Sequence, residues 1–123
     1  MIAIPLKTNK QNSAVAPLFG KAKWFAFVEN GNITIEKNEA QGGSSVVKWL
    51  LNKGVKTLIM QKISQPPYQM IKEQGSITIL YVGSDRIELP EALKKYEANE
   101  LVILDNTNAP DIVKSHNRQH QQR

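Results

Sequence analysis

Four consecutive small residues, Gly42-Gly43-Ser44-Ser45, are the part of this 123-residue chain best suited to binding chemistry. They precede apolar residues at helical spacing, so they mark the start of a helix. Glycine lets a ligand approach the backbone, and the free amides and dipole of a helix N-terminus favour an anion. Two interpretations stay open. One is a loop with a serine N-cap, and the other is a cradle for carboxylate or oxo groups, assisted by Lys7 or Lys62.

The two histidines of the chain, His116 and His120, form a second candidate site. Their spacing of four residues would place both on one face of a helix, where they could bind one metal ion. The surrounding segment 115–123 is polar throughout, and such a segment does not readily hold a helix alone. We therefore prefer a solvated tail and keep the metal site as the alternative.

The absence of cysteine removes several kinds of chemistry. The chain can form no disulfide, no thiolate nucleophile and no cysteine-ligated zinc or iron–sulfur site. A nuclease would need several carboxylates on its central strands to hold divalent metal ions. The segments 2–6 and 55–60, which we expect to be central strands, contain none. We find no catalytic constellation and expect a protein that is not an enzyme.

The elements that must position these residues follow a regular order. Apolar runs and alternation predict strands over 2–6, 24–29, 32–37, 55–60 and 77–82, and helices from Ser44 or Ser45 to Gly54, from about Pro66 to Gly75 and from Pro90 to about Asn99. Asn30-Gly31 is a strong hairpin signal between the second and third strands. With right-handed crossovers, the result is a three-layer, ribonuclease H-like α/β fold. Its mixed five-stranded sheet has the order 3-2-1-4-5, with the second strand antiparallel and helices on both faces.

This order places the topological switch point between strands one and four. Ligands of open α/β sheets tend to bind in the crevice at such a point. Lys7, Thr8 and Asn9 follow the first strand, and Gln61, Lys62 and Ile63 follow the fourth. We therefore expect the binding site at this end of the sheet.

The C-terminal part of the chain divides near residue 105. Residues 1–105 are the predicted domain, and within it the apolar run 101–104 fits either an added edge strand or a strip packed on the body. From residue 106 to residue 123 the composition turns to Asn, Gln, Ser and charge, which predicts a flexible polar tail.

Short motifs in the same order as these elements resemble the dinitrogenase iron–molybdenum cofactor-binding family, which acts in cofactor biosynthesis. The matching pieces are Ile2-Ala3-Ile4-Pro5, Pro17-Leu18-Phe19-Gly20-Lys21-Ala22, the Phe25–Val28 strand with its Asn-Gly hairpin, Gln41-Gly42-Gly43-Ser44 and Lys53-Gly54-Val55. The similarity covers roughly residues 1–98. It implies that the protein binds or carries an iron–molybdenum cofactor or a related iron–sulfur cluster, and that cofactor-assembly proteins are its partners.

The resemblance adds residues of the matching turns to the binding site. Together with the switch-point residues, the predicted binding set is Lys7, Phe19, Gly20, Gln41, Gly42, Gly43, Ser44, Ser45, Gln61 and Lys62. The sequence departs from the family where a metal would be held. Leu18 stands in place of the motif histidine, and Ala40-Gln41 has no histidine before the glycines. The predicted domain therefore lacks the usual His and Cys ligands, which disfavours direct ligation.

We therefore predict a small non-enzymatic binding or carrier protein for an anionic metal cluster, related to nitrogen fixation through its family. The alternative is a protein–protein or nucleic-acid interaction module on the same scaffold that has lost the cofactor ligands. In the protein–protein case residues 101–104 would be used for pairing, for example in a homodimer. A net charge of +5 suits an anionic ligand, but the chain lacks the dense basic stripe with interleaved aromatics that is typical of nucleic-acid binding. The longest apolar runs are too short for a membrane span, and we expect a cytoplasmic protein without a membrane partner.

Overall fold

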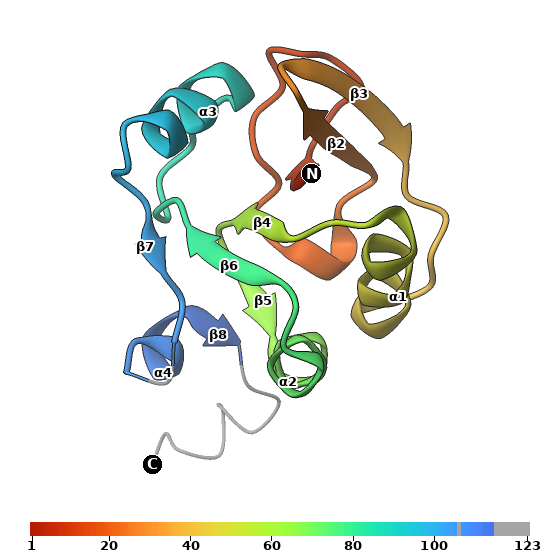
Figure 1. Ribbon diagram of the computed structural model, residues 1–123, viewed down its shortest axis with the longest axis vertical. Helices are drawn as coiled ribbons and strands as arrows, with labels where there is room; N and C mark the ends of the chain where they lie inside the picture. Colours follow the sequence, from red (N-terminus) through yellow and green to blue (C-terminus); the bar gives the residue numbers. More distant parts are fainter. Residues whose placement is uncertain (106, 115–123) are drawn as a thin grey trace.

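A computed structural model describes residues 1–105 and 107–114. Its main feature is a mixed six-stranded sheet with the strand order β3-β2-β1-β4-β6-β7 (Figure 1). The strands are β1 (Ile2–Leu6), β2 (Trp24–Glu29), β3 (Asn32–Lys37), β4 (Thr57–Met60), β6 (Thr78–Tyr81) and β7 (Val102–Ile103). The central strands β1, β4 and β6 are parallel, whereas β2, β3 and β7 each run antiparallel to their neighbours.

Helices cover both faces of this sheet. The helices α1 (Gly43–Lys53) and α2 (Gln65–Gln74) lie on one face, and α3 (Leu89–Glu97) lies on the other (Figure 1). The period of two along each strand divides the core between these faces. In β4, for example, Leu58 and Met60 pack toward α1 and α2, whereas Ile59 packs toward α3.

Local sequence signals explain most element ends. Asn30 and Gly31 have φ angles of 53° and 80° and form the β2–β3 turn, as expected of an Asn-Gly pair. Gly54 and Gly75 end α1 and α2 in the left-handed conformation. Among the described residues, no helix is long and apolar enough to cross a membrane.

Three expectations need correction. The predicted five-stranded, ribonuclease H-like order is not what the structure shows, because β7 pairs with β6 and makes a sixth strand. The fourth and fifth predicted strands each begin later, at Thr57 and Thr78. A serine was also expected to cap α1, but the helix already begins at Gly43 and its N-cap is Gly42.

The described residues after 105 form two short elements. The helix α4 (Ala109–Ile112) leads into β8 (Val113–Lys114), which pairs in parallel with β5 (Ile63–Ser64) in a separate two-stranded sheet. These elements fall within the segment predicted to be a polar tail. His116 and His120 lie outside the described residues.

Candidate functional site

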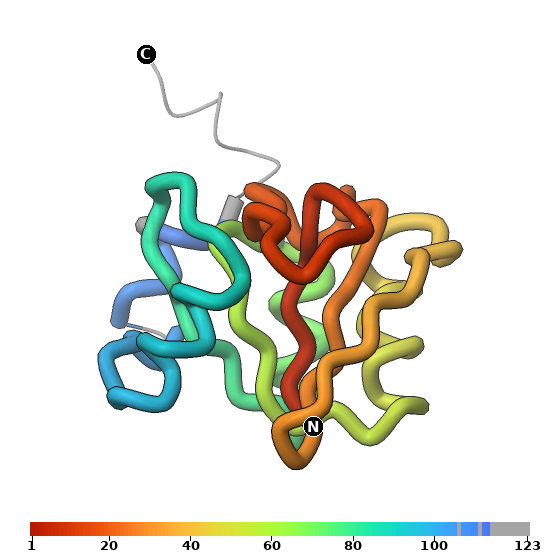
Figure 2. The backbone as a smooth tube through the Cα atoms, turned by 90° about the horizontal axis from the view of Figure 1, so that it is seen from above, coloured from red at the N-terminus to blue at the C-terminus, as the bar shows by residue number. Residues whose placement is uncertain are grey.

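The predicted switch-point residues lie at one end of the sheet. Because β1 and β4 are parallel, the residues that follow them, Lys7 and Gln61-Lys62, emerge at the same end. The loop after β1 lies at the end opposite the N-terminus (Figure 2). Lys7 and Lys62 are both exposed, so their ammonium groups are available to a ligand at this end.

A groove of about 380 Å³ opens beside Lys7. It is lined by Leu6, Lys7, Ala16, Pro17, Leu18, Lys21, Ala22 and Lys23. Three of these residues are lysines and none is acidic, so the lining carries only positive charge. The walls between the lysines are apolar, and Leu6, Ala16 and Ala22 are buried. The groove is therefore suited to an anion that also offers polarizable or apolar surface.

A short 3₁₀ helix, η1 (Phe19–Lys21), joins this groove to the helix starts. The backbone N–H of Phe19 donates a hydrogen bond of 2.8 Å to the carbonyl of Lys62. A Cβ atom on Gly20 would lie 3.1 Å from Cα of Gly43, and one on Gly43 would lie 2.7 Å from Cγ of Pro67 in α2. Both positions therefore favour glycine for lack of space, and the contacts bring η1, α1 and α2 together.

The first turn of α1 is open to solvent. Gly42, at φ 89°, precedes the helix, and no side chain caps it. Gln41, Ser44 and Ser45 are exposed. An anion that approached this turn would meet backbone amides at the positive end of the helix dipole, as in other anion-binding helix starts.

Two of the predicted residues have structural roles. Phe19 is fully buried and makes an edge-to-face contact with Phe25 at a centroid distance of 5.7 Å. Gln61 is 5% exposed, and its Nε2 donates to the backbone carbonyl of Asp85 at 2.5 Å. Phe19 thus anchors η1, and Gln61 ties the end of β4 to the loop before α3. Their part in binding a ligand stays a prediction.

The sequence reasoning did not single out Lys21 and Lys23 as binding residues. They alternate with Ala22 directly after the Phe-Gly turn, and this Lys-Ala-Lys pattern was the signal that could have found them. Their convergence with Lys7 depends on the path of the loop between β1 and η1, which the bridges Leu6–Val15 and Ala14–Glu88 fix.

Metal-ligating side chains do not gather in the described part of the chain. Residues 1–105 and 107–114 contain no group of three His, Cys, Asp or Glu side chains that could hold a metal ion. The whole chain has no cysteine. Soft metals prefer thiolate and imidazole ligands, so these residues do not fit a cluster bonded directly to the protein. They fit an anion held by charge and by contact with the groove walls.

The structure is a small α/β domain with an open mixed sheet and a lysine-lined groove beside the end of β1, and Lys62 does not line this groove. Residues 1–99 match the family described as dinitrogenase iron-molybdenum cofactor, and the chain belongs to this family. The family resemblance inferred from the sequence motifs is thereby confirmed.

Solved structures share the fold of this chain. A Thermotoga protein named as a NifB candidate of the DUF35 family is similar over 84% of this chain and 91% of its own, at 27% identity and a TM-score of 0.70. The apo form of the orange protein from Desulfovibrio gigas is similar over 84% of this chain and 91% of its own. At 15% identity and a TM-score of 0.73, that likeness shows a shared fold. No curated protein matches the chain.

Proposed function

We propose that this protein is a non-enzymatic binding or carrier protein for an anionic metal cluster or a related ligand. The observation that carries the proposal is the groove lined by Lys7, Lys21 and Lys23, with apolar walls and no acidic residue. The family description, which names an iron–molybdenum cofactor, supplies the class of ligand. The cluster is cargo in this proposal.

The binding mode follows from the side chains present. Lysine is a compact point charge that suits a multiply charged anion without demanding one geometry. The three ammonium groups would meet the outer anionic atoms of the cluster, and the apolar walls would exclude water from part of its surface. The open first turn of α1, held against η1 by the Gly20–Gly43 contact, would add backbone donors.

A non-enzymatic role is supported by the side chains that the described part offers. Histidine and cysteine, frequent general bases and nucleophiles in enzymes, do not occur in residues 1–105 and 107–114. A protein–protein interaction module is the second candidate. It is favoured by Val102 and Ile103, whose side chains are 52% and 57% exposed on the edge strand β7.

The test is an anaerobic titration of the purified chain with isolated iron–molybdenum cofactor, followed by absorption spectroscopy. The informative variant is the double substitution Lys21→Gln and Lys23→Gln. Its control is Lys72→Gln, an exposed lysine on α2 that does not line the groove. We expect saturable one-to-one binding by the native chain. The double variant should weaken this binding at least roughly tenfold, because each lost charge removes on the order of 1 kcal/mol of binding energy. The control variant should bind with unchanged affinity.

A truncation after Lys114 separates the groove from the tail histidines. This cut removes His116 and His120 but keeps α4 and β8, which a cut after Asp105 would remove as well. Binding that survives this truncation supports the groove. Binding that disappears assigns the ligands to the tail, and absence of binding to the full chain favours the interaction module.

A further inference from the structure

The segment after the family match forms a strap across one side of the molecule. We define the strap as residues 101–105 and 107–114, which include β7, α4 and β8. The match to the family ends at residue 99, so the strap lies outside the matched residues. Figure 1 shows it running from the outer edge of the sheet at β7 to β8, close to β5 and α2.

The strap ends beside the connection that carries Lys62. Val113 pairs with Ile63, and Lys114 pairs with Ser64, the N-cap of α2. The residue before this pairing, Lys62, accepts the hydrogen bond from the Phe19 amide. Hence β8 is fixed to the same short connection that holds η1 in place.

The contacts of η1, α1 and α2 close into a ring beside the groove, and Lys21 of η1 belongs to both. From Phe19 the chain passes to Gly20, which packs on Gly43 at the start of α1. Gly43 packs in turn on Pro67 in the first turn of α2, and α2 begins at the residue after Ser64. The strap is attached to this ring through the pairing of β8 with Ile63 and Ser64, between Lys62 and α2.

Apolar side chains hold the strap down. Leu104, Ala109, Ile112 and Val113 are each at most 9% exposed and join the core under α1 and α2. Two backbone connections accompany them, the short pairing of β7 with β6 and the two-residue pairing of β8 with β5. The amide of Leu104 donates to the carbonyl of Ile79 at 2.8 Å. A segment with so few long-range hydrogen bonds can open without unfolding the rest of the domain.

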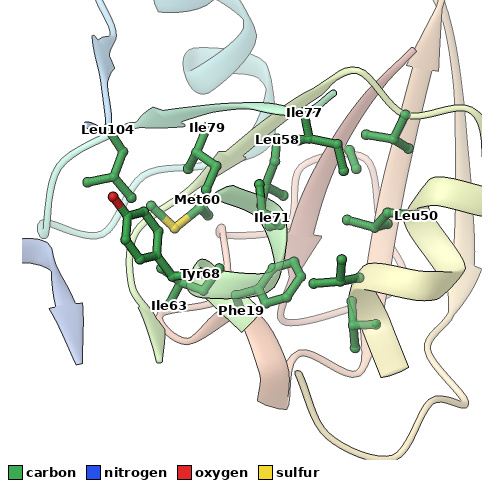
Figure 3. Close-up of a cluster of buried hydrophobic side chains, with 14 of the residues drawn as sticks. Phe19, Leu50, Leu58, Met60, Ile63, Tyr68, Ile71, Ile77, Ile79 and Leu104 are labelled. Carbon is green, nitrogen blue, oxygen red and sulfur yellow. The ribbon is translucent and has the colours of Figure 1, made fainter. Parts of the chain in front are cut away.

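One contact under the strap is unfavourable. Tyr68 of α2 is 4% exposed, and its hydroxyl has no hydrogen-bond partner among the described residues. Figure 3 shows this hydroxyl directed toward Leu104 of the strap. A buried hydroxyl without a partner loses its hydration energy, and it regains that energy when water reaches it. The lost hydration of the Tyr68 hydroxyl therefore offsets part of the free energy that the apolar contacts of the docked strap contribute.

We propose that docking of the strap and ligand binding at the lysine-lined groove are coupled. The docked strap holds the β4–α2 connection, and through Lys62 and Phe19 it holds η1 with Lys21 at the groove. Release of the strap loosens η1 and weakens the retention of the ligand, so the strap regulates loading and release. The coupling to a ligand rests on the proposed function, but the coupling between strap and η1 does not. By reciprocity, a bound ligand makes the strap open less often.

Hydrogen exchange of the ligand-free protein tests the coupling first. Val113→Asp places a carboxylate at a site that is 6% exposed and detaches β8. Val102→Asp is the matched control, because Val102 belongs to the same strap but is 52% exposed. We expect Val113→Asp to accelerate exchange of both the Leu104 and the Phe19 amides by roughly tenfold or more, the range of ordinary coupling energies. Faster exchange at Leu104 with unchanged exchange at Phe19 would overturn the proposal.

A second variant acts in the opposite direction and does not threaten folding. Tyr68→Phe removes the unpaired hydroxyl and keeps the ring. We expect it to slow exchange of the Leu104 and Phe19 amides together, by several-fold to roughly tenfold. Slower exchange at Leu104 alone would again contradict the coupling.

Titration with isolated iron–molybdenum cofactor completes the test. We expect Val113→Asp to lower the affinity for the cofactor by about the same factor by which it accelerates hydrogen exchange of the Phe19 amide. Val102→Asp should leave the affinity unchanged. An unchanged affinity in Val113→Asp, with fast exchange at Phe19, would overturn the regulatory role and leave the carrier function standing. If the native chain does not bind the cofactor, the proposed function fails, whereas the exchange of the Phe19 amide still decides whether strap and η1 are coupled.

Discussion

Replacement of Gly43 by alanine tests the packing that joins α1 to α2. The new Cβ would lie 2.7 Å from Cγ and 3.1 Å from Cβ of Pro67. A proline ring cannot rotate away, so α1 or α2 must shift. Overpacking of this kind costs about 1 to 3 kcal/mol, whereas the gain in helix propensity is at most about 1 kcal/mol, and less in the first turn. We expect a net loss of about 1 to 2 kcal/mol in the free energy of unfolding.

Urea denaturation followed by circular dichroism measures this loss. Ser44→Ala is the matched control, since Ser44 is the next residue of the same helix turn and is exposed. It should change stability by less than about 0.5 kcal/mol. In the double variant Gly43→Ala with Pro67→Ala the ring atom at 2.7 Å is gone, so the combined loss should be smaller than the sum of the two single losses. A Gly43→Ala protein as stable as the native chain would refute the reasoning.

Three further predictions concern stability. Burial, and secondarily the negative charge of Asp105, raises the pKa of Tyr68 above 10.0. The unfolded chain therefore loses this proton at lower pH than the folded chain, so the free energy of unfolding should fall as the pH rises through about 10. Unfolding measured across pH 8–11 should show a less steep fall in Tyr68→Phe. Asn99 has a φ of 63°, so Asn99→Ala should lower the melting temperature by a few degrees, whereas Asn99→Gly should not. Lys53 pairs with Glu36 at 2.6 Å at a partly exposed site, so Glu36→Gln should cost at most about 1 kcal/mol, and this cost should shrink in 1 M salt.

Periodicity and turn residues predicted the body of the fold because they act locally. The alternation in β3, the Asn-Gly turn and the glycines after α1 and α2 each determine an element from a few neighbouring residues. The pairing of β5 with β8 could not be predicted in this way. It joins residues about fifty positions apart, and each strand has only two residues. Neither strand is long enough to show a period. Their apolar residues, Ile63 and Val113, are buried only because the folded chain brings them against residues of α2 and β6.

In the candidate site, too, some residues could be predicted from the sequence and others could not. Lys7 and Lys62 follow from the strand order, because topology alone places the ends of β1 and β4 together. Lys21 and Lys23 join Lys7 only through the folded path of the loop before η1, which local patterns do not specify. The predicted serine N-cap is wrong. The N-cap of α1 is Gly42, two residues before Ser44 and three before Ser45, and Gly43, inside the helix, packs closely on Pro67.

The side chain of Asn108 has a consequence for how copies of this protein behave at high concentration. Its Nδ2 donates a hydrogen bond of 3.0 Å to the carbonyl of Ile103 on the outer strand of the sheet. An open carbonyl at such an edge can template the addition of a strand from another molecule, which is how many sheets begin to aggregate. Asn108 occupies that acceptor beside the exposed Val102 and Ile103 side chains. Loss of its amide group would leave the Ile103 carbonyl without this donor beside two exposed apolar side chains. Strands of other molecules could then add to this edge, and fibres would form more readily at high concentration.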